Sequence, residues 1–204
     1  DGIRDVAVTG VQTCALPISD YLSDLSATNV LNYSANGQQA IFDASSGTGV
    51  AVFQIADLET ALKNRSQLIF NMPTGYDAVI VNVAGTNVKL PSSINFNGPT
   101  GLGAKVIWNF YEAATVDLGS KSWYGSILAP QAQIKNNNYV EGAVVAASML
   151  QNGEIRMNGF SATDLLISST AAAVPEPAAW ALMILGFGAV GSILRRRRAV
   201  VASS

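Results

Sequence analysis

The sequence predicts a mainly β protein in which short strands pair in parallel, coil upon coil, as a right-handed parallel β-helix (β-solenoid). Residues 105–157 contain short apolar runs separated by small or polar turn residues, a pattern typical of many short strands. Within them, the Gly-Ser-Ile-Leu-Ala of residues 125–129 returns as the Gly-Ala-Val-Val-Ala of residues 142–146, 17 positions later, which is about one coil. These runs lack the polar alternation of half-exposed antiparallel strands. We therefore favour the solenoid over the alternative, a β-sandwich.

The preceding elements fit the same fold. Residues 19–48 mix turn formers with short apolar groups, and residues 50–55, 68–72, 78–84 and 88–90 are β-rich runs. One short helix is predicted for residues 58–64, because Asp57 is a suitable N-cap and Leu58, Ala61 and Leu62 share a face. We expect it to be the only helix of the domain, packed alongside the solenoid. A loop follows at residues 91–103, rich in Gly and Asn.

The C-terminal tail predicts a membrane-spanning helix. Residues 178–194 carry no charge, and at a rise of ~1.5 Å per residue they extend roughly 26 Å, close to the ~30 Å apolar thickness of a bilayer. Arg195, Arg196, Arg197 and Arg198 follow at once. Because cations favour the cytoplasmic side, residues 199–204 are expected inside and the preceding domain outside.

The tail also resembles the PEP-CTERM sorting signal of Gram-negative bacteria. The resemblance rests on Pro175, Glu176 and Pro177, on the Trp-Ala-Leu of residues 180–182, on the Gly-Phe-Gly of residues 186–188 and on the arginine run. It implies that an exosortase recognises residues 175–177, and that the precursor is held in the inner membrane, then cut and either released or transferred. An ordinary single-span anchor is the alternative.

Residues 1–18 resemble a translated sequencing adapter. Residues 8–18, Val-Thr-Gly-Val-Gln-Thr-Cys-Ala-Leu-Pro-Ile, match the adapter codon by codon in one frame. We therefore exclude residues 1–18 from the expected fold; the alternative is a genuine N-terminal strand. The native N-terminus, with any signal peptide, is then expected to be missing.

Composition excludes several functions. The chain has no histidine, and its single cysteine, Cys14, cannot form an internal disulfide. Histidine is the commonest general base and a common zinc ligand, so we expect no catalytic residues, no cofactor and no metal. The net charge is −2, and the basic residues before the tail are scattered singly, which disfavours nucleic acid as a partner.

A second resemblance concerns the domain itself. The residues that carry it are Val-Ile-Trp-Asn-Phe at 106–110, Trp-Tyr-Gly-Ser-Ile-Leu-Ala-Pro at 123–130, Glu-Gly at 141–142 and Gly-Glu-Ile at 153–155. They look like the choice-of-anchor A domain, a family of bacterial surface proteins regarded as adhesive. The order of elements is also similar to the ice-binding β-helix of bacteria, as an analogy of fold alone. The expected organisation is a domain at 19–160, a spacer at 161–174 and the sorting signal at 175–198.

Two rival functions are weighed against adhesion. A polysaccharide-acting enzyme would need two carboxylates in one cleft; the candidates are Glu112, Asp117, Glu141 and Glu154, of which Glu141 and Glu154 precede corresponding coils. Solvated or turn-bonded acids are the expected outcome.

Ice binding would need regular Thr-x-Thr rows, whereas Thr86, Thr100 and Thr115 are isolated. Among the aromatic residues, Tyr124 and Tyr139 are the candidate ligand surface, while Trp108 is expected in the core. The sequence thus predicts an exported, exosortase-processed, non-enzymatic protein of the cell surface or biofilm matrix, with exopolysaccharide as a candidate ligand.

Overall fold

A computed structural model describes residues 6–45, 49–72, 76–98, 101–156 and 160 of the chain. That part is mainly β, with few helices, as predicted. Its helices are α1 (Val6–Ser23), α2 (Leu58–Leu62) and the 3-10 helix η1 (Leu102–Ala104). Its strands are β1 (Leu31–Tyr33), β2 (Gln39–Asp43), β3 (Gly49–Ile55), β4 (Gln67–Asn71), β5 (Tyr76–Val83), β6 (Asn87–Lys89), β7 (Asn95–Asn97), β8 (Val106–Asn109), β9 (Thr115–Asp117), β10 (Trp123–Tyr124), β11 (Ser126–Asn136), β12 (Val140–Glu141), β13 (Val144–Gln151) and β14 (Ile155–Arg156).

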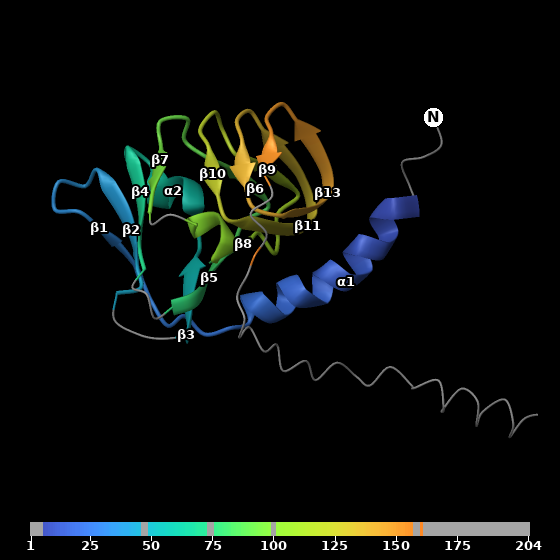
Figure 1. Cartoon of the computed structure of the whole chain (residues 1–204), viewed down its shortest axis with the longest axis horizontal. Coiled ribbons are helices and arrows are strands. Elements are labelled where there is room, and N and C mark those ends of the chain that lie inside the picture. Colours follow the sequence, from blue (N-terminus) through green and yellow to red (C-terminus); the bar gives the residue numbers. More distant parts are fainter. Residues whose placement is uncertain (1–5, 46–48, 73–75, 99–100, 157–159, 161–204) are drawn as a thin grey trace, which may run out of the picture. The chain divides into compact units, whose positions relative to one another are not determined.

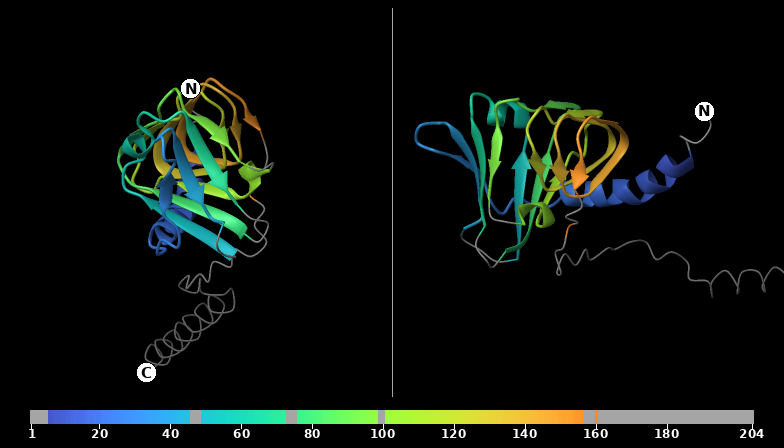
Figure 2. Two further views of the ribbon diagram at one scale, coloured as in Figure 1. Left: turned by 90° about the vertical axis from the view of Figure 1, so that its left-hand side faces the viewer. Right: turned by 45° about the horizontal axis from the view of Figure 1, so that its top comes forward.

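The strands form parallel ladders to which the chain returns in each circuit (Figure 1). One ladder contains β2, β4 and β7, another β10, β12 and β14, and the largest contains β3, β5, β8, β11 and β13, with β6 and β9 pairing beside the second half of β11. The largest sheet curls like a half-barrel (Figure 2). Among the described pairs only β1 with β2 is antiparallel. The predicted parallel pairing is therefore confirmed, and an antiparallel sandwich does not fit it.

The register confirms the short internal repeat. Ile127 pairs with Val144 and Ala129 with Ala146, so residues 125–129 and 142–146 lie on neighbouring strands at equivalent positions. Earlier partners lie farther apart in the sequence: Phe53 pairs with Val81, 28 positions on. The circuits therefore shorten along the chain. Because their lengths differ, the first half of the domain shows no repeat of constant period in the sequence.

An aromatic cluster fills the space between the ladders. Phe42 stacks on Phe70 with ring centroids 4.7 Å apart, and Trp108 lies 4.6 Å from Trp123 by the same measure. Phe96 joins them, 4.6 Å from Trp123. Each large apolar side chain withdrawn from water stabilises the fold by about 1.5–3 kcal/mol. This cluster, with the buried valines and alanines of the strands, is the main core.

Helix α1 covers the outer face of the largest sheet and corrects the prediction of a single helix. Its Leu22 packs on Val52 and Ile80 in a second, smaller core. Two buried amides of the sheet bond to its backbone: Asn82 Nδ2 donates to the Leu22 carbonyl, and Asn109 Nδ2 donates to the Ser19 carbonyl at 2.8 Å. These bonds tie the C-terminal end of the helix to the sheet. The sequence pattern missed α1 because residues 1–18 were set aside.

Within α1, residues 6–18 are those that resemble adapter. Of the side chains described there, Ala15 is buried, whereas Cys14, Pro17 and Ile18 are exposed. Among the described side chains of the helix, the deeply buried ones are Ser19 and Leu22, where the native domain is predicted to begin. The origin of residues 1–18 stays a prediction.

Helix α2 confirms the predicted cap. The Asp57 carboxylate accepts a hydrogen bond from the Thr60 backbone N–H at 2.9 Å, and Leu58 and Leu62 are buried. The Thr60 hydroxyl also donates to this carboxylate, and both bonds hold the pKa of Asp57 below its usual value. The helix ends at Leu62, two residues earlier than predicted.

The predicted membrane helix, residues 178–194, lies outside the described residues, as do the spacer and the sorting signal. Among the residues that the structure does describe, no helix is both long and apolar enough to cross a bilayer.

Candidate functional site

The two tyrosines singled out in the sequence meet on one face of the ladder formed by β10, β12 and β14. Strand alternation sets this face: Trp123 and Val140 point into the core and are buried, so their neighbours Tyr124 and Glu141 point outward. The register places Glu141 between Tyr124 and Arg156 on successive strands. We call Tyr124, Tyr139, Glu141, Glu154 and Arg156 the tyrosine face.

The tyrosines of this face hold each other in place. Their hydroxyl oxygens lie 2.6 Å apart, and their rings meet edge to face with centroids 5.9 Å apart. The Arg156 guanidinium lies over the Tyr139 ring, 4.0 Å from its centroid, and its Nε bonds to Glu154 Oε2 at 3.1 Å. Stacking on the ring and pairing with Glu154 together fix the arginine head.

The hydrogen bonds at the two phenols shift their pKa values in opposite directions. The bond to Tyr139, reinforced by partial burial, raises the pKa of Tyr124 to about 12. Hydrogen bonds from Ser122 and Tyr124 lower the pKa of Tyr139. The geometry allows either hydroxyl to donate in the bond between them. The opposite directions of the two pKa shifts mean that Tyr139 ionises before Tyr124.

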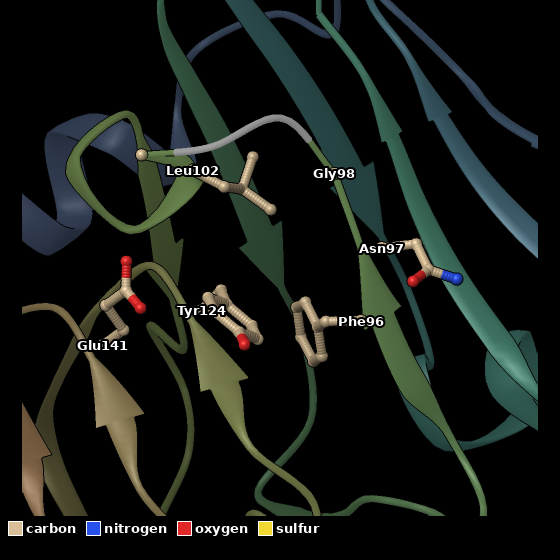
Figure 3. A pocket seen from close by; sticks show the side chains of 7 residues that line it. Phe96, Asn97, Gly98, Leu102, Tyr124 and Glu141 are labelled. Carbon is tan, nitrogen blue, oxygen red and sulfur yellow. The ribbon is translucent and has the colours of Figure 1, made fainter.

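A pocket of about 290 Å³ opens beside Tyr124 (Figure 3). Tyr124, Phe96 and Glu141 direct their side chains toward it, and Leu102 of η1 stands opposite. Its described lining consists of Phe96, Asn97, Gly98, Gly101, Leu102, Tyr124 and Glu141. The side chains turned toward the pocket are two aromatic rings, one leucine and one carboxylate, whereas the Asn97 side chain points away from them. Such a mixture suits a ligand with both an apolar face and polar substituents.

The pocket depends on close backbone packing at η1. A Cβ atom added to Gly103 would lie 2.6 Å from the Glu141 backbone oxygen and 3.2 Å from its Oε1. Contacts this short force neighbours to move, so glycine permits η1 to lie against Glu141. The sequence showed residues 91–103 only as a loop. Its glycines and asparagines indicated a constrained backbone, but no pattern in the sequence pointed to its partner, Glu141, which follows Gly103 by 38 positions.

The tryptophans belong to the core, as expected for Trp108. Trp108 and Trp123 are 0% and 1% exposed. Trp108 Nε1 donates to the Tyr124 carbonyl at 3.0 Å, which ties the site to the core beneath it. Among the described residues Trp123 Nε1 is buried without a hydrogen-bond acceptor.

The candidate carboxylates of the rival enzyme have separate partners. Glu112 accepts the Gly85 N–H at 3.2 Å, and Asp117 pairs with Lys135 at 3.6 Å. Glu154 pairs with Arg156, and among the described lining of the pocket Glu141 is the only carboxylate. Glu141 and Glu154 both belong to the tyrosine face, but they are offset along it, because the strand partner of Glu141 is Arg156.

The described threonines do not form the rows that ice binding would require. Thr115 lies on the outer face of the sheet, where its hydroxyl donates to Asn87 Oδ1 at 2.8 Å. The next row on that face consists of Lys89, Asp117, Lys135 and Leu150. Strongly hydrated charges there oppose a regular ice-like array. Thr100 lies outside the described residues.

Comparison with known proteins gives two family matches. Residues 5–157 match the model of a family described as "Putative Ice-binding-like adhesive domain", and residues 173–198 match the "PEP-CTERM protein-sorting motif". Neither description is that of an enzyme family. The first match begins within the adapter-like segment, and the second includes Pro175–Pro177 and all four arginines. No curated protein and no solved structure matches the chain.

Proposed function

The chain belongs to the family of ice-binding-like adhesive domains, and we propose that it is an exported, exosortase-processed adhesive protein of the cell surface or extracellular matrix. The observation that carries this proposal is the union, in one chain, of an adhesive-type domain at 5–157 with a sorting motif at 173–198. The domain supplies the contact with other material, and the motif supplies its route out of the cell.

The proposed route has two stages. The apolar residues 178–194 hold the precursor in the inner membrane with Arg195–Arg198 on the cytoplasmic side. An exosortase then recognises Pro175, Glu176 and Pro177 and cuts there, and the domain is released or transferred. The intact mass of the protein, compared in cells with and without exosortase, tests this route. A tail retained in both strains would contradict it.

The proposed architecture is the right-handed parallel β-helix expected from the sequence. Parallel ladders and the 17-residue match of Ile127 with Val144 support it. The likeness to the choice-of-anchor A domain remains a resemblance of residues, compatible with an adhesive role.

We further propose that adhesion uses the tyrosine face, with exopolysaccharide as ligand. Half-buried tyrosines fixed by a shared hydrogen bond offer rigid aromatic area at little cost in conformational entropy. Sugar rings present C–H faces that pack on such rings and hydroxyls that bond at their edges.

The test is co-sedimentation of the protein with exopolysaccharide from the producing cells, for Tyr124→Ala and Tyr139→Ala. Tyr33→Ala is the control, because Tyr33 is an exposed tyrosine away from the tyrosine face and, like Tyr139, lies beneath an arginine, with Arg65 3.7 Å from its ring centroid. We expect binding to fall about 10-fold or more in the first two variants and to be unchanged in the control. Equal binding by all three variants would contradict the assignment of this face.

A further inference from the structure

We propose that Tyr124 and Tyr139 form a site of covalent modification, at which a peroxidase-type oxidant joins the two rings as a dityrosine cross-link. This modification goes beyond the adhesive function and does not depend on which ligand the tyrosine face binds. The contact between the two phenols, their access to solvent and their place in the strand stack support it.

The contact between the two phenols already brings together the atoms that would bond. Their hydroxyl oxygens lie 2.6 Å apart, and each oxygen is attached to the ring carbon that lies between the two Cε atoms. A Cε atom of each ring is therefore close to the other phenol. The rings meet at 86° with centroids 5.9 Å apart. Because the carbon–carbon bond of a dityrosine tolerates twisted rings, the side chains need to move little to form it.

The environment of the pair favours oxidation there. Both side chains are half-buried, so an oxidant in solution can reach them. Hydrogen bonds with Ser122 and Tyr124, together with the charge of Arg156, lower the pKa of Tyr139. A lower pKa increases the share of phenolate, which gives up an electron more readily than the neutral phenol does. Tyr139 is thus the first to be oxidised, and Tyr124 is the phenol in contact with it.

The reaction is a two-electron oxidation by hydrogen peroxide, which a peroxidase carries out in two one-electron steps. Each phenol loses one electron and its hydroxyl proton and becomes a phenoxyl radical. The two radicals pair their unpaired electrons in a new Cε–Cε bond. The hydrogen on each of these carbons then leaves as a proton while the phenol oxygen takes one up, which restores both aromatic rings. The peroxide accepts the two electrons and two protons and becomes two water molecules, so the chain is lighter by two hydrogen atoms.

The cross-link would fasten two consecutive coils of the stack to each other. Tyr124 ends β10, and Tyr139 immediately precedes β12, the parallel partner of β10. The new bond closes a loop of 15 residues, and a disulfide that closes a loop of this size restrains the unfolded chain strongly. The single cysteine of the sequence, Cys14, cannot form an internal disulfide. A dityrosine is therefore a covalent tie between coils that this sequence can form without a second cysteine.

The experiment treats the full chain in detergent micelles with a peroxidase and a limiting amount of hydrogen peroxide. Intact mass, dityrosine fluorescence and peptide mapping are measured. The variants are Tyr124→Phe and Tyr139→Phe, which keep the ring and lack the phenol. Tyr33→Phe is the control, because Tyr33 is exposed and lies beneath Arg65 but contacts no other tyrosine ring among the described side chains.

We expect the unsubstituted chain and the control to become lighter by two hydrogen atoms as monomers, with the link mapped between Tyr124 and Tyr139. Neither of the other two variants should form it. By analogy with a disulfide that closes a loop of this size, the cross-link should raise the midpoint of thermal unfolding by about 5–10 °C.

Three results would overturn the proposal. One is a cross-link that joins separate chains instead of Tyr124 and Tyr139. Another is a monomeric cross-link that persists in either Tyr124→Phe or Tyr139→Phe. The third is an unsubstituted chain that keeps its mass under conditions that cross-link free tyrosine. Circular dichroism before oxidation verifies that each variant is folded.

Discussion

Replacing either core tryptophan by phenylalanine is the sharpest test of how the site is tied to the core. Trp108 and Trp123 are almost fully buried and lie side by side in the aromatic cluster. Trp108→Phe and Trp123→Phe therefore remove the same atoms from the same kind of surroundings. The two positions differ in their polar contact: Trp108 Nε1 donates to the Tyr124 carbonyl, and Trp123 Nε1 has no acceptor among the described residues.

The expected difference in the free energy of unfolding between the two variants follows from this polar contact. Trp108→Phe loses a hydrogen bond with a net value of about 0.5–1.5 kcal/mol and deprives the Tyr124 carbonyl of this donor. Trp123→Phe loses no hydrogen bond to the described residues and removes a buried N–H that has no acceptor among them. The loss of packing is common to both variants. We therefore expect Trp108→Phe to lower the free energy of unfolding by about 1–2 kcal/mol more than Trp123→Phe does.

The assay is urea denaturation followed by far-ultraviolet circular dichroism, since tryptophan fluorescence changes with the substitutions themselves. Because Trp108 bonds to Tyr124, only Trp108→Phe should also weaken exopolysaccharide binding. Equal destabilisation by the two variants, or greater destabilisation by Trp123→Phe, would refute the reasoning.

Three further predictions concern the strand stack, helix α1 and the tyrosines. Gly142 has a φ of 153°, and a Cβ atom on it would lie 2.5 Å from the Gly125 backbone oxygen. Gly142→Ala should therefore lower the free energy of unfolding by about 2 kcal/mol or more, measured by thermal or urea denaturation. A loss under ~0.5 kcal/mol would contradict the tight strand spacing. Asn109→Ala removes the buried hydrogen bonds to Ser19 and should raise the rate of backbone hydrogen exchange in α1 well above that in the strands. An unchanged exchange rate would show that α1 does not depend on these hydrogen bonds. The Tyr124 phenol, whose pKa is raised to about 12, stabilises the fold below pH 10, and this contribution is lost as the pH rises from about 10 to 12. Phenolate absorbance should show Tyr139 ionising early and Tyr124 late, and Tyr139→Phe should abolish the early step and weaken the late one. Six tyrosines titrating together near pH 10 would be incompatible with the bond between the two hydroxyls.

Strand content and pairing were predictable because buried parallel strands leave a local signature. The apolar run of residues 50–55 became β3, and the repeat at residues 125–129 and 142–146 gave the register of two adjacent strands correctly. The Asp57 cap was also predictable, since it depends on a hydrogen bond to a residue three positions away. Helix α1 was not predicted because most of it lies in the adapter-like residues 1–18, which were excluded from the expected fold. The sheet amides that bond to it, Asn82 and Asn109, look like ordinary strand residues in the sequence.

The candidate site was predictable only in part. Tyr124 and Tyr139 were selected from the sequence as surface aromatics, and the structure brings their hydroxyls together. The pocket beside them was not foreseen, because Phe96 and Leu102 come from a circuit of the chain far from Glu141. The pairing of Glu154 with Arg156 depends on side-chain direction, which no spacing rule provides.

The sequence by itself determined which sorting motif this protein carries and which class of fold its domain adopts. Both are local properties: the sorting motif is contiguous at 173–198, and burial on parallel strands imposes apolar runs on each segment. The tertiary structure decided which residues share a surface. Circuits of 28 residues at Phe53 and 17 at Ile127 bring side chains together across unequal loops, so the tyrosine face and its pocket exist only once the coils are stacked.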